Sequence, residues 1–163
     1  MERQRRVAGS ARFAELARML DVDVDARDEH QRWDVYRQAL ARPGLEPQLL
    51  ATTANEPDGA IAVGVVFEML ERLDPDAAAP WIEAVPASHR DKVLTRAGDL
   101  AILRACVPPD AAASSDAVDS WSDWLQRRLV DDTASLGVLA LLEVHGRTRR
   151  VRGRARSRLA AKR

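Results

Sequence analysis

Apolar residues recur at helical spacing along most of the chain. Phe13, Leu16 and Leu20 fall on one face of a segment that Ser10 can cap, and Asp28 can begin a second segment of the same kind. No convincing run alternates between apolar and polar residues, as a half-buried β-strand would. The pattern therefore predicts an all-α protein of about eight helices.

Prolines divide the middle of the chain into short helical elements. They occur only between Pro43 and Pro109, and a proline in a helix interior breaks the helix. Longer helices are predicted over 59–73, 88–106, 116–130, 133–144 and from Thr148 onward. Asp58, Thr133 and Thr148 are expected to cap the first, fourth and fifth of these, and Gly146 is expected to end the fourth. Gly64 costs about 1 kcal/mol of helix propensity in the middle of its helix, which indicates a close contact with another helix there.

Length and composition fit one folded domain. The chain has 163 residues, of which 46% are apolar and 31% charged, and this supplies a core without a metal or a disulfide. We expect a flexible basic N-terminus over residues 1–9 and a single all-α domain over 10–163. Within that domain we expect a helix pair over 10–42 and stacked hairpins over 46–163, which end in an arginine-rich helix.

Cysteine usage and the length of the apolar runs favour a cytoplasmic protein. The single cysteine, Cys106, lies in an apolar run, so we expect a buried, inert thiol in a reducing compartment. The longest apolar runs, 59–67 and 136–142, are shorter than the roughly 20 residues of a membrane-spanning helix. The first residues also lack the apolar segment of a signal peptide, and no membrane partner is expected.

The net charge of zero conceals a strong segregation of charge. Residues 147–163 carry a net charge of +9 and residues 1–6 carry +2, so residues 7–146 carry −11. Arginine is the usual cation throughout the chain. Its presence near the C-terminus is therefore uninformative, whereas its density there requires an explanation.

The segment from Thr148 onward is predicted to form an ordered helix. Val151, Ala155 and Leu159 lie at i, i+4 and i+8 and form one apolar stripe that can pack on the rest of the chain. The arginines fall on two flanks beside this stripe. One flank holds Arg149, Arg152 and Arg156, and the other holds Arg147, Arg150, Arg154 and Arg158.

Two roles are open for these arginines. In the first, their aliphatic stems cover the rim of the core while their charged ends stay in water or meet acidic groups of the protein. In the second, they bind the phosphates of a nucleic acid, or an acidic protein partner. The acidic remainder of the chain would repel a duplex, and no aromatic residue stands among the arginines to stack on single-stranded bases. The first role is therefore favoured.

Two segments resemble the second helix of HEAT repeats. Residues 151–159, V-R-G-R-A-R-S-R-L, are similar to the V-R-x-x-A-x-x-x-L signature of that helix, and DGAIAVGVVFEMLERL follows it loosely. The resemblance implies stacked helix pairs, either as a fragment of a HEAT-like α-solenoid or as an irregular helical bundle. Such stacks commonly offer a curved surface for binding.

Short catalytic and metal-binding motifs are missing from the sequence. His30, His89 and His145 are isolated, and neither a phosphate-binding loop nor a nucleophile elbow is present. The run DVDVDARDEH imitates the start of a calcium-binding EF-hand loop, but Ala26 stands where the loop needs glycine and Arg32 where it needs glutamate. No metal and no cofactor are expected, and an enzyme is the less favoured interpretation.

The run WSDW offers a candidate partner contact. Trp121 continues an apolar stripe with Val118, Leu125 and Leu129 and is predicted to lie in the core. Trp124 falls off this stripe, where an exposed aromatic residue can anchor a partner. Some HEAT-like DNA glycosylases also use tryptophan and aspartate on a basic surface, but the similarity gives no catalytic role to a particular residue here.

Three functions remain, in order of preference. The first is a non-enzymatic protein-interaction or scaffold module that uses the helical-repeat surface, with Trp124 and the arginine helix as contacts. The second is a nucleic-acid-binding module that uses the arginine helix. The third is a HEAT-like nucleic-acid enzyme such as a DNA glycosylase. Another protein is thus the expected partner, a nucleic acid is possible, and the oligomeric state is open.

Overall fold

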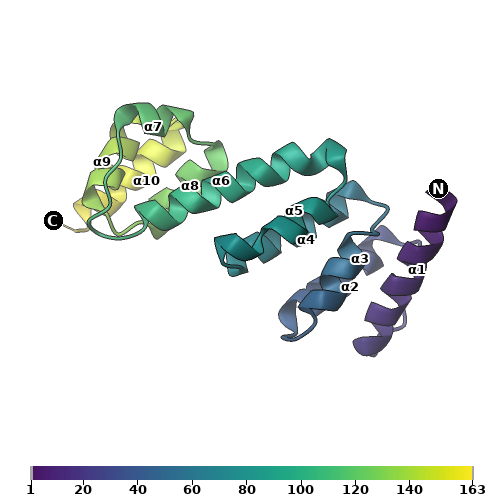
Figure 1. Ribbon diagram of the computed structural model, residues 1–163. Helices are drawn as coiled ribbons and strands as arrows, with labels where there is room; N and C mark the ends of the chain where they lie inside the picture. Colours follow the sequence, from purple (N-terminus) through teal and green to yellow (C-terminus); the bar gives the residue numbers. More distant parts are fainter. Residues whose placement is uncertain (1, 163) are drawn as a thin grey trace. The chain divides into compact units, whose positions relative to one another are not determined.

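The computed structural model describes residues 2–162, with side chains from residue 11 onward (Figure 1). In this part of the chain it contains ten α-helices and two short 3₁₀ helices, η1 and η2, and no strand. The all-α prediction is confirmed, and the number of helices is ten where about eight were expected. The chain divides into two compact units, residues 1–97 and 98–163, and the boundary between them falls within the sequence of the long helix α6.

The first unit is built from α1 to α5 and the beginning of α6. Its elements are α1 (Glu2–Met19), α2 (Glu29–Ala41), α3 (Glu46–Thr53), α4 (Gly59–Arg72), η1 (Pro75–Ala77), α5 (Ala79–Ala84), η2 (Ala87–His89) and the first part of α6 (Arg90–Cys106). Helix α1 packs on α3, α2 packs on α4, and both α3 and α4 pack on α5. Ser10 lies inside α1, so its expected capping role is wrong. The preceding residues include Glu, Arg, Gln and Ala, which favour a helix.

Side chains cap two helices of this unit as the sequence predicts. The carboxylate of Asp28 accepts hydrogen bonds from the backbone N–H groups of His30 and Gln31, at 2.9 and 3.2 Å, and begins α2. These bonds, that from Gln31 above all, hold the pKa of Asp28 below its ordinary value. Asp58 caps α4 in the same way, through the N–H groups of Ala60 and Ile61.

The close contact predicted at Gly64 is confirmed. A Cβ atom added at Gly64 would lie 3.1 Å from two ring carbons of Trp33, which packs from α2 onto α4. Glycine is therefore tolerated here because it lets the two helices approach each other.

A buried polar cluster joins α2 to the loop between α3 and α4. The hydroxyl of Tyr36 donates to Oε2 of Glu56 at 2.9 Å, and the N–H of Asp58 donates to Oε1 at 3.0 Å. The guanidinium of Arg32 forms an ion pair with the same carboxylate, with Nε and Oε1 3.3 Å apart. Burial, and then the charge of Glu56, raise the pKa of Tyr36 far above its ordinary value, so this hydroxyl stays a donor.

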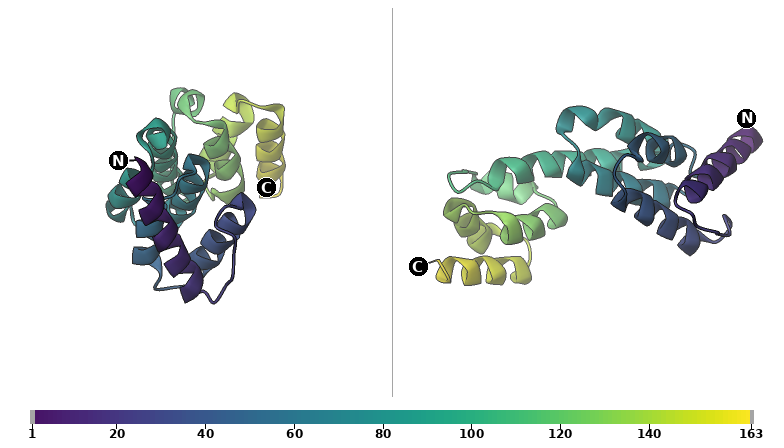
Figure 2. Two further views of the ribbon diagram at one scale, coloured as in Figure 1. Left: turned by 90° about the vertical axis from the view of Figure 1, so that its right-hand side faces the viewer. Right: turned by 90° about the horizontal axis from the view of Figure 1, so that it is seen from below.

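The second unit holds four helices besides the end of α6. They are α7 (Ser115–Ser120), α8 (Asp123–Asp132), α9 (Leu136–His145) and α10 (Arg149–Ala160). Helices α9 and α10 form a hairpin and lie side by side (Figures 1 and 2), and α10 also packs on α8 while α7 packs on α9. The core between them contains Val118, Trp121, Leu125, Leu129, Val138, Leu139, Leu142, Val151 and Ala155.

The expected helix over 116–130 is two helices. Val118, Trp121, Leu125 and Leu129 are all buried as predicted, but the chain leaves α7 at Trp121 and begins α8 after Ser122. The hydroxyl of Ser122 accepts a hydrogen bond from the N–H of Leu125 at 3.1 Å and so caps the new helix.

The expected cap at Thr133 is also wrong. Thr133 ends α8, and its buried hydroxyl donates to the carbonyl of Cys106. Ser135 caps α9 in its place, because its Oγ accepts from the N–H of Val138 at 3.2 Å. Gly146 ends α9 as predicted.

None of the described helices combines the length and the apolar character that crossing a membrane requires.

Cys106 is buried and free, and burial raises the pKa of its thiol. We expect this thiol to react with a thiol-specific reagent such as DTNB much more slowly in the native protein than in urea. Absorbance during the reaction measures the rate. Equal rates in the two conditions would contradict the burial of Cys106.

Candidate functional site

Helix α10 is docked through the apolar stripe that the sequence predicts. Thr148 caps it, since its Oγ1 accepts a hydrogen bond from the N–H of Val151 at 3.1 Å. Val151 and Ala155 are buried, and Leu159 is half-buried. The arginine-rich segment is therefore a packed helix of the second unit.

The arginines lie on two flanks of α10, as expected. On the side of α9, Arg156 pairs with Glu143 at 2.8 Å and Arg152 donates to the carbonyl of Gly146. On the side of α8, Arg154 pairs with Asp131. Exposed pairs of this kind contribute at most about 1 kcal/mol each, so their main effect is to orient the guanidinium groups.

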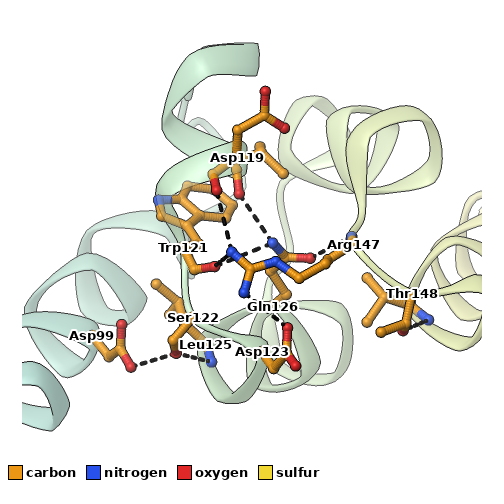
Figure 3. Close-up of polar contacts among 11 residues, drawn as sticks. Asp99, Asp119, Trp121, Ser122, Asp123, Leu125, Gln126, Arg147 and Thr148 are labelled. Carbon is orange, nitrogen blue, oxygen red and sulfur yellow. Dashed lines mark hydrogen bonds and ion pairs between the residues drawn. The ribbon is translucent and has the colours of Figure 1, made fainter. Parts of the chain in front are cut away.

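Arg147 binds the end of α7 (Figure 3). Its guanidinium donates to the carbonyls of Asp119 and Trp121, at 3.3 and 3.0 Å, and pairs with Asp123 at 3.2 Å. The last carbonyls of a helix have no partner within the helix, and a cation there also opposes the negative end of the helix dipole. Arg147 thus holds the α9–α10 turn against the break between α7 and α8.

Gln126 completes this contact from inside the unit (Figure 3). Its side chain is fully buried on α8, and its amide group donates to the carbonyls of Val118 and Trp121 at 3.0 and 3.3 Å. Its Oε1 accepts from the backbone N–H of Arg147 at 2.8 Å. One glutamine therefore links the end of α7 to the α9–α10 turn.

Arg158 binds carbonyls at the end of α8, as Arg147 binds carbonyls at the end of α7. Its guanidinium donates to the carbonyls of Val130, Asp131 and Thr133, at 2.6, 3.0 and 2.9 Å. Lys162 adds a bond to the carbonyl of Ala134 at 3.1 Å. Arg158 and Lys162 thus bind carbonyls at and just after the end of α8, whereas the roles considered from the sequence involved water, acidic groups or an outside partner.

Arg149 and Arg150 differ from the other five arginines. Both are exposed in the first turn of α10, and neither has a hydrogen bond or an ion pair with any described residue. Arg149 belongs to the flank facing α9. Arg150 belongs to the opposite flank, where it lines a small pocket with Val130 and Arg154.

Trp124 is half-buried on α8, and the guanidinium carbon of Arg128 lies 5.4 Å from its ring centroid. Its neighbour Trp121 is buried in the core, as predicted. A contact between Trp124 and a partner remains a prediction.

The outer face of α9 is an exposed apolar surface that the sequence pattern did not predict. Val144 has an exposed fraction of 69%, Leu136 and Ala140 are also exposed, and Leu141 is half-buried. A shallow groove follows this face and is lined by Ala111, Ala112, Ala113, Gly137, Ala140, Leu141, Val144 and His145. The available signal was the composition of α9, whose residues are apolar on nearly every side.

Comparisons with known proteins give no indication of function. No family model matches the chain, and no curated protein or solved structure is significantly similar to it. Within residues 2–162, no group of three or more His, Cys, Asp and Glu side chains is arranged to hold a metal ion.

Two glycines of the α9–α10 hairpin give opposite expectations. Gly153 is exposed and nothing lies within 4 Å of a Cβ placed there, so Gly153→Ala is expected to raise the free energy of unfolding by about 1 kcal/mol. At Gly146 the added Cβ would lie 2.7 Å from Cγ1 of Val151, so Gly146→Ala is expected to lower it. Urea unfolding followed by circular dichroism measures both changes. Equal signs would contradict the packing of this hairpin.

Proposed function

We propose that the chain is a non-enzymatic protein-interaction module and that a partner protein binds the outer face of α9. The observation that carries this proposal is the exposed apolar groove along that helix. An apolar groove beside a packed hairpin is the kind of surface on which proteins bind segments of other proteins.

The contacts of the arginines favour a protein over a nucleic acid as the partner. Arg147 and Arg158 donate to helix-terminal carbonyls, and Arg154 and Arg156 pair with carboxylates of the same unit. A phosphate backbone would have to displace these partners, so the electrostatic gain would be smaller than nine cations suggest. An apolar groove also contributes nothing to phosphate binding.

We further propose that the helices stack as hairpins of the HEAT-like kind. Support comes from the packing of α1 on α3, α2 on α4, α7 on α9 and α8 on α10. Each pair joins helices that lie two apart along the chain, as stacked hairpins require.

Co-purification with an exposed-site variant tests the proposed function. Val144→Glu places a charge in the groove without touching the core, and Leu94→Glu is a matched control on α6, where Leu94 is 50% exposed. We expect a stoichiometric partner protein to co-purify from native lysate with the parent chain and with Leu94→Glu. Recovery with Val144→Glu should fall at least about tenfold, the loss expected when a charge enters a central apolar contact.

Two results would contradict the proposal: no stoichiometric partner, or a partner that is recovered equally well with Val144→Glu. Recovery of nucleic acid in place of a protein, with a steep decrease as salt is raised, would favour the nucleic-acid hypothesis.

A further inference from the structure

The exposed residues of α9 form a continuous apolar stripe. Leu136, Ala140 and Val144 follow each other at intervals of four, so each is turned by only about 40° from the last, and the stripe spans about 12 Å along the helix. Gly137 has no side chain and leaves the surface hollow beside them. A stripe of this length matches roughly two turns of a second helix.

One wall of the groove is apolar and fixed in place. It is formed by Ala111, Ala112 and Ala113. The hydroxyl of Ser135 donates to the carbonyl of Ala111 at 2.7 Å, which ties this wall to the start of α9. Among the described residues that line the groove, His145 is the only one with an ionisable side chain.

The opposite side of the stripe borders the arginine flank of α10. Glu143 lies at the edge of the stripe nearest α10, because its carboxylate pairs with Arg156. Arg152 donates to the carbonyl of Gly146 at the same end of α9. Arg149 lies about one turn before Arg152 in α10 and has no described partner. Three arginines against one glutamate leave this edge positive.

We propose that the groove takes an amphipathic helix of a partner protein, with an apolar face for the stripe and acidic residues on the edge that meets Arg149. This proposal rests on the proposed function and adds the chemistry of the partner. Apolar anchors at i, i+3 or i+4, and i+7 are how grooves bind helices. Arg149 is exposed at the rim of the groove and has no bond with a described residue, so it is free to pair with an acidic residue of that helix.

A second copy of this chain fits the groove less well. In a symmetric antiparallel contact, a second copy would bring its own Arg149, Arg152 and Arg156 to the same edge, so like charges would face each other. The acid at that edge, Glu143, is already paired with Arg156.

Selection of peptides on the whole chain tests this inference. The probe is a displayed library of random peptides about 16 residues long, which would span about 24 Å as a helix. Peptides enriched on the parent chain are then synthesised, and their binding is measured by fluorescence anisotropy. We expect them to be net acidic and to carry apolar residues at helical spacing.

Arg149 and Arg150 supply a matched pair of variants for the same measurement. Both are exposed and adjacent in sequence, but they lie on opposite flanks of α10. Arg149→Glu is expected to weaken the selected peptides roughly fivefold, with a smaller loss at high salt, whereas Arg150→Glu should stay within about twofold. Val144→Glu should weaken them at least about tenfold.

The outcomes separate this inference from the proposed function. Peptides that need Val144 but are neutral or basic, or that respond equally to Arg149→Glu and Arg150→Glu, would overturn the acidic partner and leave the proposed function standing. If no peptide is enriched, or if binding is indifferent to Val144→Glu, both the acidic partner and the α9 surface are overturned.

Discussion

Replacing Gln126 with leucine is expected to lower the free energy of unfolding of the second unit by about 3 kcal/mol. Leucine fills a similar volume, so the loss comes from hydrogen bonds. The carbonyl of Val118 and the backbone N–H of Arg147 both lose a buried partner, and the carbonyl of Trp121 keeps only its bond from Arg147. The substitution removes three hydrogen bonds at about 1 kcal/mol each. It leaves the N–H of Arg147 without a partner, while the carbonyl of Val118 keeps its bond from the N–H of Trp121.

Urea unfolding followed by circular dichroism measures this change. Gln38→Leu is the control, because the side chain of Gln38 is exposed on α2 and has no hydrogen bond with a described residue. We expect less than about 0.5 kcal/mol for the control, as for most surface substitutions. A loss below about 1 kcal/mol for Gln126→Leu would mean that Gln126 does not connect α7 to the α9–α10 turn.

Replacing Glu56 with alanine is expected to lower the free energy of unfolding of the first unit by about 4 kcal/mol. The side chain of Glu56 is 2% exposed and that of Arg32 is 12% exposed, so the substitution leaves a nearly buried charge without its partner. It also removes the acceptor of the Tyr36 hydroxyl and of the Asp58 N–H. These losses add to the cost of desolvating Arg32.

A second arginine–glutamate pair in the same unit provides the control. Arg72 and Glu68 are also 3.3 Å apart, but their side chains are 46% and 54% exposed. Because solvent screens this pair, Glu68→Ala is expected to cost less than about 1 kcal/mol in the same unfolding experiment. Similar losses for Glu56→Ala and Glu68→Ala would show that burial does not decide the strength of the Glu56 cluster.

Local signals in the sequence predicted the helix ends that depend on neighbouring residues. Asp28, Asp58 and Thr148 cap helices, and Gly146 ends one, because each acts on backbone groups within a few residues of itself. The break at Ser122 was missed because the spacing of the apolar stripe is the same whether one helix or two carries it.

Contacts between residues that are distant in the sequence could not be predicted at the site. The two arginine flanks of α10 follow from the helix period alone. The partners of Arg147 and Arg158 do not, since they are carbonyls of helices that begin more than fifteen residues earlier in the chain. The exposed face of α9 was hidden for a related reason. A helix that is apolar nearly all round gives no pattern to say which side the fold leaves open.

Amide hydrogen exchange of α10 shows whether the arginine helix is packed in place and holds the ends of its neighbours. We predict that the amides from Val151 to Leu159 exchange as slowly as those of α9. Arg158→Ala should speed exchange in α10 and at the end of α8 together, while Arg150→Ala should change neither. Exchange of the α10 amides at the rate of an unfolded chain would mean that α10 is not packed on the second unit.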